Sequence, residues 1–168
     1  MYVTINIRDI KEVGSTMRLT NFSDYSIRVL MYLASHPDRL VNIKEIAEAY
    51  GISKNHLMKI IYQLGKLGYI ETVRGRNGGM RLGMDPEEIN LGSLVRKTEE
   101  DFNIVECFSD HNTCPISPVC TLRGVLNKAL YAFLNVLDGY TLADISQNKE
   151  VLAQFLGSAS QVNNDSND

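Results

Sequence analysis

Residues 52–82 read ISKNHLMKIIYQLGKLGYIETVRGRNGGMRL and decide the fold of this 168-residue chain. The first half has helical periodicity, because its apolar residues recur every three or four positions from Leu57 to Leu67. Ser53 stands just ahead of this run, where a serine hydroxyl can cap the start of a helix. The second half has two short strand-like runs around an Arg-Asn-Gly-Gly turn, which is typical of a β-hairpin. The stretch therefore predicts a helix followed directly by a hairpin.

A second, shorter helix is expected immediately before this stretch. Residues 43–50 read IKEIAEAY, with Asn42 as the capping residue and Gly51 as the stop. A helix, a tight turn containing glycine and a second helix that begins after a serine form the helix-turn-helix pattern. With the hairpin as a wing, the sequence predicts a winged helix-turn-helix.

Further helices are expected on both sides of this core motif. An earlier helix, capped by Asn21 or Ser23, ends near His36-Pro37. Its apolar face consists of Ile27, Leu30, Met31 and Ala34. After the hairpin, Asp85-Pro86-Glu87 is expected to start another helix that runs to about Thr98.

Charge is divided unevenly along the chain. Residues 17–84 carry ten Lys and Arg against five Asp and Glu, whereas residues 85–168 carry five against thirteen. A basic first half is typical of a surface that binds a polyanion such as DNA. The apolar fraction of 44% is ordinary for a globular protein, and no apolar run approaches the roughly eighteen residues that a membrane span needs. For the charge pattern alone, chance is the alternative to a nucleic-acid-binding surface. The absence of a membrane span and of a secretory signal is expected of a cytoplasmic protein without a membrane partner.

The helix and hairpin of residues 53–82 supply the candidate residues for reading DNA. A helix in the major groove reads bases through side-chain donors and acceptors, and arginines beside glycines suit phosphates or the minor groove. The predicted DNA-binding residues are Ser53, Lys54, Asn55, His56, Lys59, Arg74, Arg76, Asn77, Gly78 and Arg81. Met58 and Tyr62 lie on the same face, but Met58 has no expected base partner beyond a thymine methyl group.

Residues 121–140 predict a long C-terminal helix. Apolar residues spaced 4-3-4-3-4 are typical of a helix that packs along another helix. The stripe consists of Leu122, Leu126, Ala129, Phe133, Val136 and Tyr140. An ordinary core helix is the alternative, but the small N-terminal module cannot cover so long a stripe, which favours a dimer interface.

The cysteines of the chain, Cys107, Cys114 and Cys120, lie within fourteen residues of one another. Three thiols cannot all pair within one chain, and the sequence starts without a secretory signal, so the cluster indicates metal or redox chemistry. The spacers hold six and five residues, which fits the short spacers of zinc sites poorly. An iron–sulfur cluster fits better, because thiolates can reach it from a wide loop and a non-cysteine fourth ligand is tolerated.

With these motifs in place, residues 17 to about 145 resemble the winged-helix iron–sulfur repressors, the family that includes the NsrR and IscR regulators. MRLTNFSDYSIRVLMYLA (17–34) is similar to the first helix of that family, and residues 52–82 are similar to its recognition helix and wing, most closely in the NsrR branch. The resemblance implies a homodimeric repressor that binds partly palindromic, double-stranded operator DNA. It also implies that nitric oxide reacts with the cluster, releases the operator and derepresses nitric-oxide detoxification genes.

The same resemblance implies a metal site made of the three cysteines and a fourth ligand. IscR-like proteins have a histidine three residues after the third cysteine, where this chain has Arg123. NsrR-like proteins carry an acidic residue early in the first helix, here Asp24, donated by the other subunit. Asp24 also stands four residues before Arg28, so a simple ion pair is the alternative, and His111 in the loop is the rival ligand. The first spacer is one residue longer than expected; a 4Fe-4S cluster is preferred over 2Fe-2S, although ligand residues do not distinguish them.

Other kinds of site stay open on the sequence alone. The three cysteines with His111 or Asp24 could hold a structural zinc ion, or the thiols could sense peroxide without a metal. Within the family, an IscR-like regulator of cluster assembly is the nearest alternative. An enzyme using Cys107 and His111 is the weakest alternative, because no motif supplies a pocket or an activated thiolate. We therefore expect a regulator and not an enzyme.

The chain divides into four expected segments. Residues 1–16 are either a mobile arm or an artefact of the start site, since Met17 opens the periodic sequence. Residues 17–84 form the winged helix-turn-helix domain, and residues 85–145 form the cluster loop and the dimerisation helix. Residues 146–168 form a C-terminal segment whose polar tail after Gly157 is expected to be disordered. The expected fold class is mainly α.

Overall fold

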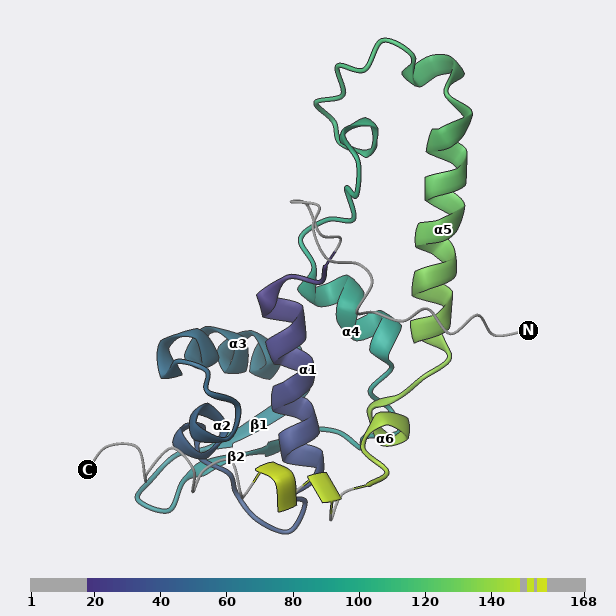
Figure 1. The fold of residues 1–168 in the computed structure, drawn as a ribbon. Coiled ribbons are helices and arrows are strands. Elements are labelled where there is room, and N and C mark those ends of the chain that lie inside the picture. Colours follow the sequence, from purple (N-terminus) through teal and green to yellow (C-terminus); the bar gives the residue numbers. More distant parts are fainter. Residues whose placement is uncertain (1–17, 149–150, 153, 157–168) are drawn as a thin grey trace.

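The computed structural model describes residues 18–148, 151–152 and 154–156 of the chain (Figure 1). The predictions for residues 1–16 and for the tail after Gly157 fall outside these described residues. In chain order the elements are α1 (Asn21–Ala34), α2 (Ile43–Tyr50), α3 (Lys54–Lys66), β1 (Ile70–Val73), β2 (Gly79–Leu82), α4 (Leu91–Thr98), η2 (Glu106–Phe108), η3 (Ser117–Val119), α5 (Thr121–Asp138) and α6 (Leu142–Ile145). A mainly helical fold with a small hairpin confirms the predicted fold class.

The helix-turn-helix, α2 and α3, forms where local sequence signals place it. The Asn42 side chain accepts hydrogen bonds from the backbone of Lys44 and Glu45, and Glu45 reaches back to the Asn42 backbone in a capping box. Gly51 ends α2 with a φ of 64°, a left-handed conformation that favours glycine. The Ser53 hydroxyl then accepts from the His56 backbone N–H and starts α3. All three predicted boundary residues are confirmed.

The wing is an antiparallel hairpin. β1 and β2 pair from Ile70 opposite Leu82 to Val73 opposite Gly79. The hairpin is tied to the helices, because Met80 exchanges two backbone hydrogen bonds of 2.8 and 2.9 Å with Val41, in the connection between α1 and α2. The wing therefore extends from the same body that carries the helix-turn-helix (Figure 1).

α1 is the central helix and packs against α3, α4, α6 and β2. The residues that share its core are drawn from both halves of the chain, including Leu30, Leu57, Leu64, Ile89 and Leu142, all with no accessible surface. The prediction that Asn21 or Ser23 caps α1 is wrong. Thr20 is the cap and accepts from the Ser23 backbone N–H, while the Ser23 hydroxyl is buried and donates to Thr98 at 2.7 Å.

The prediction of a helix that starts at Asp85-Pro86-Glu87 is also wrong. Those residues form a turn, in which the Glu88 N–H donates to the Asp85 carbonyl, and α4 begins only at Leu91. Asn90 caps α4 through its side-chain oxygen and uses its amide nitrogen to bond the carbonyls of Asp138 and Tyr140. The cap is thus fixed by a contact with the end of α5.

α5 projects from this body as an arm (Figure 1). Its C-terminal part lies beside α4, and its N-terminal end stands far from the helix-turn-helix, where the loop of residues 99–120 connects it back to α4. Arg96 on α4 forms a two-bond ion pair with Asp138 at the foot of the arm. Along α5, Leu134 is buried and Leu130 half-buried against this base.

Among the residues that the structure describes, no helix has the length and the apolar character needed to cross a membrane.

Candidate DNA-binding surface and candidate metal centre

The outward face of α3 carries the predicted recognition residues. Lys54, Asn55, His56 and Lys59 are all exposed, whereas the opposite face is buried through Leu57, Ile60, Ile61 and Leu64. Ser53 has a second role, because its hydroxyl caps the helix. The first turn of α3 also leaves backbone N–H groups at a positive helix end, which suits phosphate contacts. The structure thus brings these residues together on one accessible helix surface.

The wing presents a second basic surface. Arg74, Arg76 and Asn77 are exposed in the turn between β1 and β2. Arg81 lies on β2 and is held by Glu71 of β1, with Nε and one Nη of the guanidinium each 2.8 Å from the Oε2 atom of Glu71. Among the predicted wing residues, Arg81 is therefore neutralised in part, and the arginines of the turn are freer to meet a phosphate.

The glycines of the wing have an internal role. Gly75 adopts a φ of 123°, a conformation that side chains disfavour. A Cβ at Gly78 would collide with the carbonyl oxygen of Val73. The turn itself therefore requires these glycines, in addition to any close approach to DNA for which Gly78 was predicted.

The cysteines lie in the loop between α4 and α5. Cys107, Cys114 and Cys120 are free thiols of intermediate exposure, and Cys120 directly precedes α5. The Glu106 carboxylate accepts hydrogen bonds from the Thr113 hydroxyl at 2.6 Å and the Thr113 backbone at 2.8 Å. These bonds lower the pKa of Glu106 and bring the neighbours of two cysteines together. Sequence reasoning missed this tie, because a glutamate and a threonine seven residues apart carry no pattern of their own.

The loop carries donor side chains suited to a metal centre, but these side chains do not converge on one point. Within the described parts of the chain, no three His, Cys, Asp or Glu side chains converge closely enough to hold a metal ion. His111, the rival fourth ligand, is exposed in the loop. Three free thiols on a segment outside the core are chemically suited to iron. The donor set therefore fits an iron–sulfur cluster, and ligation would require the loop to close.

Asp24, the predicted fourth ligand, lies on α1 and is paired with Arg28. Arg28 contacts both carboxylate oxygens, at 3.0 and 2.8 Å, and about two fifths of each side chain stays accessible. The Arg28 guanidinium also lies 5.9 Å from the ring centres of Tyr25 and Tyr50. The i,i+4 ion pair that the sequence offered as an alternative is present, and within one chain it occupies Asp24.

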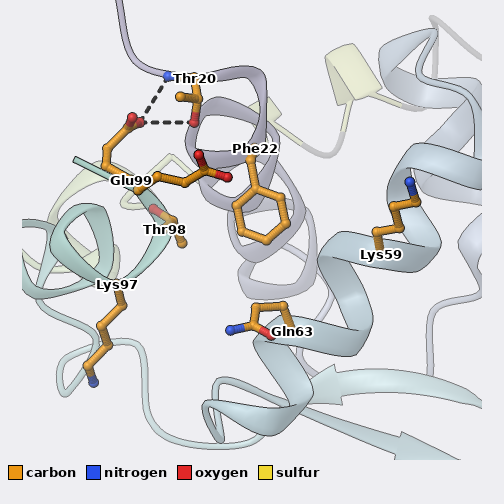
Figure 2. A pocket seen from close by; sticks show the side chains of 8 residues that line it. Thr20, Phe22, Lys59, Gln63, Lys97, Thr98 and Glu99 are labelled. Carbon is orange, nitrogen blue, oxygen red and sulfur yellow. Dashed lines mark hydrogen bonds between the residues drawn. The ribbon is translucent and has the colours of Figure 1, made fainter. Parts of the chain in front are cut away.

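A hollow of about 370 Å³ lies where the cysteine loop leaves the body (Figure 2). Phe22 at the start of α1 and Gln63 of α3 line it, as does Lys59, so one predicted DNA-binding residue stands at its edge. Glu99, the first residue after α4, accepts hydrogen bonds from the Thr20 backbone at 2.9 Å and the Thr20 hydroxyl at 3.1 Å. The beginning of the cysteine loop is therefore bonded to the start of α1. This long-range contact has no sequence signature.

The apolar stripe predicted on the last helix is largely uncovered. Leu122, Phe133, Val136 and Tyr140 are exposed by 40–62%, Ala129 is exposed and Leu126 is half-buried. The side of α5 that faces the body uses other residues, chiefly Leu130, Leu134 and Leu137. The stripe is thus not part of the core of the single chain.

A helix-turn-helix with a wing, joined to a cysteine-bearing loop and a helical arm, defines a transcriptional regulator of the winged-helix class. The chain belongs to the Rrf2 family, described as iron-dependent transcriptional regulators, whose sequence pattern matches residues 19–148. This match covers the described body and the arm alike.

Relatives in several bacilli have high identity to the chain. The HTH-type transcriptional regulator NsrR of Bacillus subtilis (strain 168) is 65% identical over 142 residues, which cover 83% of this chain and 97% of that protein. The NsrR of Geobacillus kaustophilus (strain HTA426) is 54% identical over the same length, with the same coverage. The predicted resemblance to the NsrR branch is confirmed, and the chain is a transcriptional regulator and not an enzyme.

Solved structures agree on the fold. IscR of T. potens superposes with a TM-score of 0.63 at 27% identity, over 79% of this chain and 88% of that one. CymR, the global cysteine regulator of B. subtilis, gives a TM-score of 0.64 at 24% identity over 79% and 98%. At that identity the likeness to CymR concerns the fold alone.

Proposed function

We propose that the chain is a homodimeric repressor that holds an iron–sulfur cluster and releases operator DNA when nitric oxide reacts with that cluster. The observation that carries the proposal is the union of two features in one chain. It is 65% identical to a regulator named NsrR over nearly the whole of that protein, and it has three free cysteines on a loop outside the core. Such a regulator would act in the cytoplasm, where the operator is.

In this proposal residues 17–84 bind DNA. The exposed face of α3 enters the major groove, where Asn55 can bond adenine and Lys59 can bond guanine or a phosphate. Arg74 and Arg76 of the wing, which are exposed, contact the neighbouring backbone or minor groove. The excess of basic residues in this half of the chain supports the assignment.

Residues 85–145 hold the cluster and join the two subunits. The stripe from Leu122 to Tyr140 is apolar and exposed in one chain, so a second copy of α5 would remove it from water. Two recognition helices held at a fixed spacing then meet successive major grooves of a palindromic operator. Dimerisation through α5 sets that spacing.

The ligands in the proposal are Cys107, Cys114, Cys120 and, from the second subunit, Asp24, with His111 as the rival. When bound, the cluster supplies an iron with a weakly held fourth position, which a small neutral molecule can reach. The chain itself supplies the thiolates and the loop that must close around them. In the single chain Asp24 forms an ion pair with Arg28, and as a ligand it would share its carboxylate with Arg28 or leave it.

The contacts of α1 explain how such a site would affect DNA binding. Arg28 connects Asp24 to Tyr50, the last residue of α2, and Glu99 connects the cysteine loop to Thr20. A change at Asp24 or at Glu99 therefore acts on α1, the helix against which α3 packs. A ligand shifts the equilibrium between a DNA-binding and a DNA-releasing arrangement only if it distinguishes the two. Loss of Asp24 as a ligand would make that distinction.

The first test is anaerobic purification, followed by a visible absorption spectrum and a count of iron and acid-labile sulfide per chain. A brown protein with both elements, altered by stoichiometric nitric oxide, supports the proposal. A colourless protein with zinc or without metal overturns the cluster and leaves a zinc-stabilised or thiol-based regulator.

The second test concerns Asp24. Operator DNA bound to the wild type, to Asp24→Ala and to the control Asp38→Ala is titrated with nitric oxide. Asp38 is exposed beyond the other end of α1, so its variant should respond as the wild type does. We expect Asp24→Ala to have lost the nitric-oxide response, and an unchanged response would remove Asp24 from the ligand set and favour His111.

A further inference from the structure

Two large side chains are exposed in the middle of the recognition surface. Met58 and Tyr62 on α3 keep 55% and 69% of their accessible surface. They stand four residues apart, so they are neighbours on one strip of the helix. An apolar strip on an otherwise polar helix face is unfavourable in water, and its presence indicates a contact that removes it from solvent.

The charges around this strip decide the kind of partner. Lys54, Lys59 and Lys66 lie on the same helix, and the Lys66 ammonium is 5.6 Å from the centre of the Tyr62 ring. Charged residues are depleted from the centres of protein–protein interfaces, whereas protein–DNA interfaces are strongly positive. An apolar strip surrounded by lysines is therefore suited to DNA.

Within the major groove, only one base edge offers an apolar group, the 5-methyl of thymine. We propose that Met58 and Tyr62 are specificity residues that read thymine methyl groups in the operator. The inference rests on the proposed operator binding and adds to it a base preference that Asn55 and Lys59 do not supply. The flexible thioether of Met58 can follow a methyl group closely, and the Tyr62 ring can pack on one while its hydroxyl donates to a phosphate.

The spacing of the two residues constrains where the thymines stand. Four residues of helix rise by about 6 Å, and base pairs are stacked about 3.4 Å apart. With α3 along the groove, Met58 and Tyr62 reach bases about two pairs apart. We therefore expect two thymines at that separation in each half-site of the operator, on either strand.

The test removes the methyl groups and nothing else. The full chain, purified anaerobically, first selects its preferred duplex from random DNA. Each thymine of that duplex is then replaced singly by deoxyuridine, which keeps the base-pairing edge and lacks the methyl. For the wild type we expect about four-fold weaker binding at each of two positions per half-site, the effect of one buried methyl group.

Variants then assign the positions. In Met58→Ala one of the deoxyuridine penalties should vanish, and in Tyr62→Ala the other should vanish. Met58→Leu and Tyr62→Phe keep an apolar side chain and should keep both penalties. Because both native residues are exposed, the variants should unfold at the wild-type temperature, and the deoxyuridine scan of the unmodified chain is independent of any variant.

Two results overturn the inference and can be told apart from failure of the proposed function. A wild-type chain that binds its selected duplex with the same affinity after every deoxyuridine replacement does not read methyl groups. If the loss of affinity caused by deoxyuridine persists in full in both alanine variants, other residues recognise the thymine methyl groups. A chain that enriches no DNA sequence at all overturns operator binding, and the thymine reading with it.

Discussion

The winged-helix body and the α5 arm place their apolar residues in opposite environments. In the body, Leu30, Leu57 and Leu64 have no accessible surface. On the arm, Leu122 and Val136 are exposed by 59% and 62%, although their residue types are just as apolar. The body is stabilised by contacts within one chain, whereas the arm has an apolar surface that one chain leaves open. Mutations in the two regions should therefore differ in kind as well as in size.

The largest contrast is expected between two leucine truncations. Leu57→Ala removes a fully buried side chain and should lower the free energy of unfolding by about 2–5 kcal/mol. Leu122→Ala on the arm should change it by less than about 0.5 kcal/mol at concentrations where the chain is monomeric. Urea unfolding followed by circular dichroism measures both, and equal losses would show that the arm is part of the same cooperative core.

A charge on the arm separates folding from assembly. Val136→Asp should weaken self-association by about 100-fold or more, because an unpaired carboxylate would be buried between the two α5 helices. Asn127→Asp places the same charge on an exposed position of α5 outside the stripe and should leave association unchanged. Sedimentation velocity measures the effect, and a Val136→Asp protein that stays dimeric would place the interface elsewhere.

The wing offers a smaller effect on DNA affinity. Arg74→Ala and Arg76→Ala should each make the negative slope of log K against log salt shallower by about one, if each arginine neutralises one phosphate. Lys128→Ala, an exposed cation on the arm, is the control and should leave the slope as it is. Fluorescence anisotropy between low and moderate salt gives the slopes. Identical slopes for all three variants would contradict phosphate contacts by the wing.

The smallest effect concerns pH at the foot of the arm. The hydrogen bond from Arg96 holds the pKa of Asp138 below its ordinary value of 3.8. A carboxylate with a lowered folded-state pKa stabilises the protein above its unfolded pKa and loses that effect as the pH falls through the folded value. The melting temperatures of the wild type and Arg96→Gln should therefore differ slightly at pH 7 and converge below about pH 4. A constant difference would show that Arg96 acts only through packing.

Local signals predicted much of the fold. Asn42, Gly51 and Ser53 sit where caps were expected, because a cap depends on a side chain and the few backbone groups next to it. The failures arose where a distant partner intervened. Ser23 was a reasonable cap for α1, but its hydroxyl bonds Thr98, 75 residues away, and Thr20 takes the role.

The candidate site was predictable in its chemistry and less so in its contacts. The cysteines and the polar face of α3 could be found from residue types and spacing. The ion pair of Asp24 with Arg28 was an open alternative, and only the folded chain shows it formed. The bonds of Glu106 to Thr113 and of Glu99 to Thr20 could not be predicted, because neither pair has a periodic or motif-like spacing.

The sequence by itself determined the helix-turn-helix, the wing, the basic face and the presence of three thiols on one loop, since these follow from periodicity, capping and residue type. Tertiary structure decided which side of α5 faces the body, where α4 begins, and that the cysteine loop is bonded to the start of α1. The physical reason is that local structure depends on neighbours in sequence. The partner of a buried hydroxyl or an exposed leucine is instead set by the packing of the whole chain.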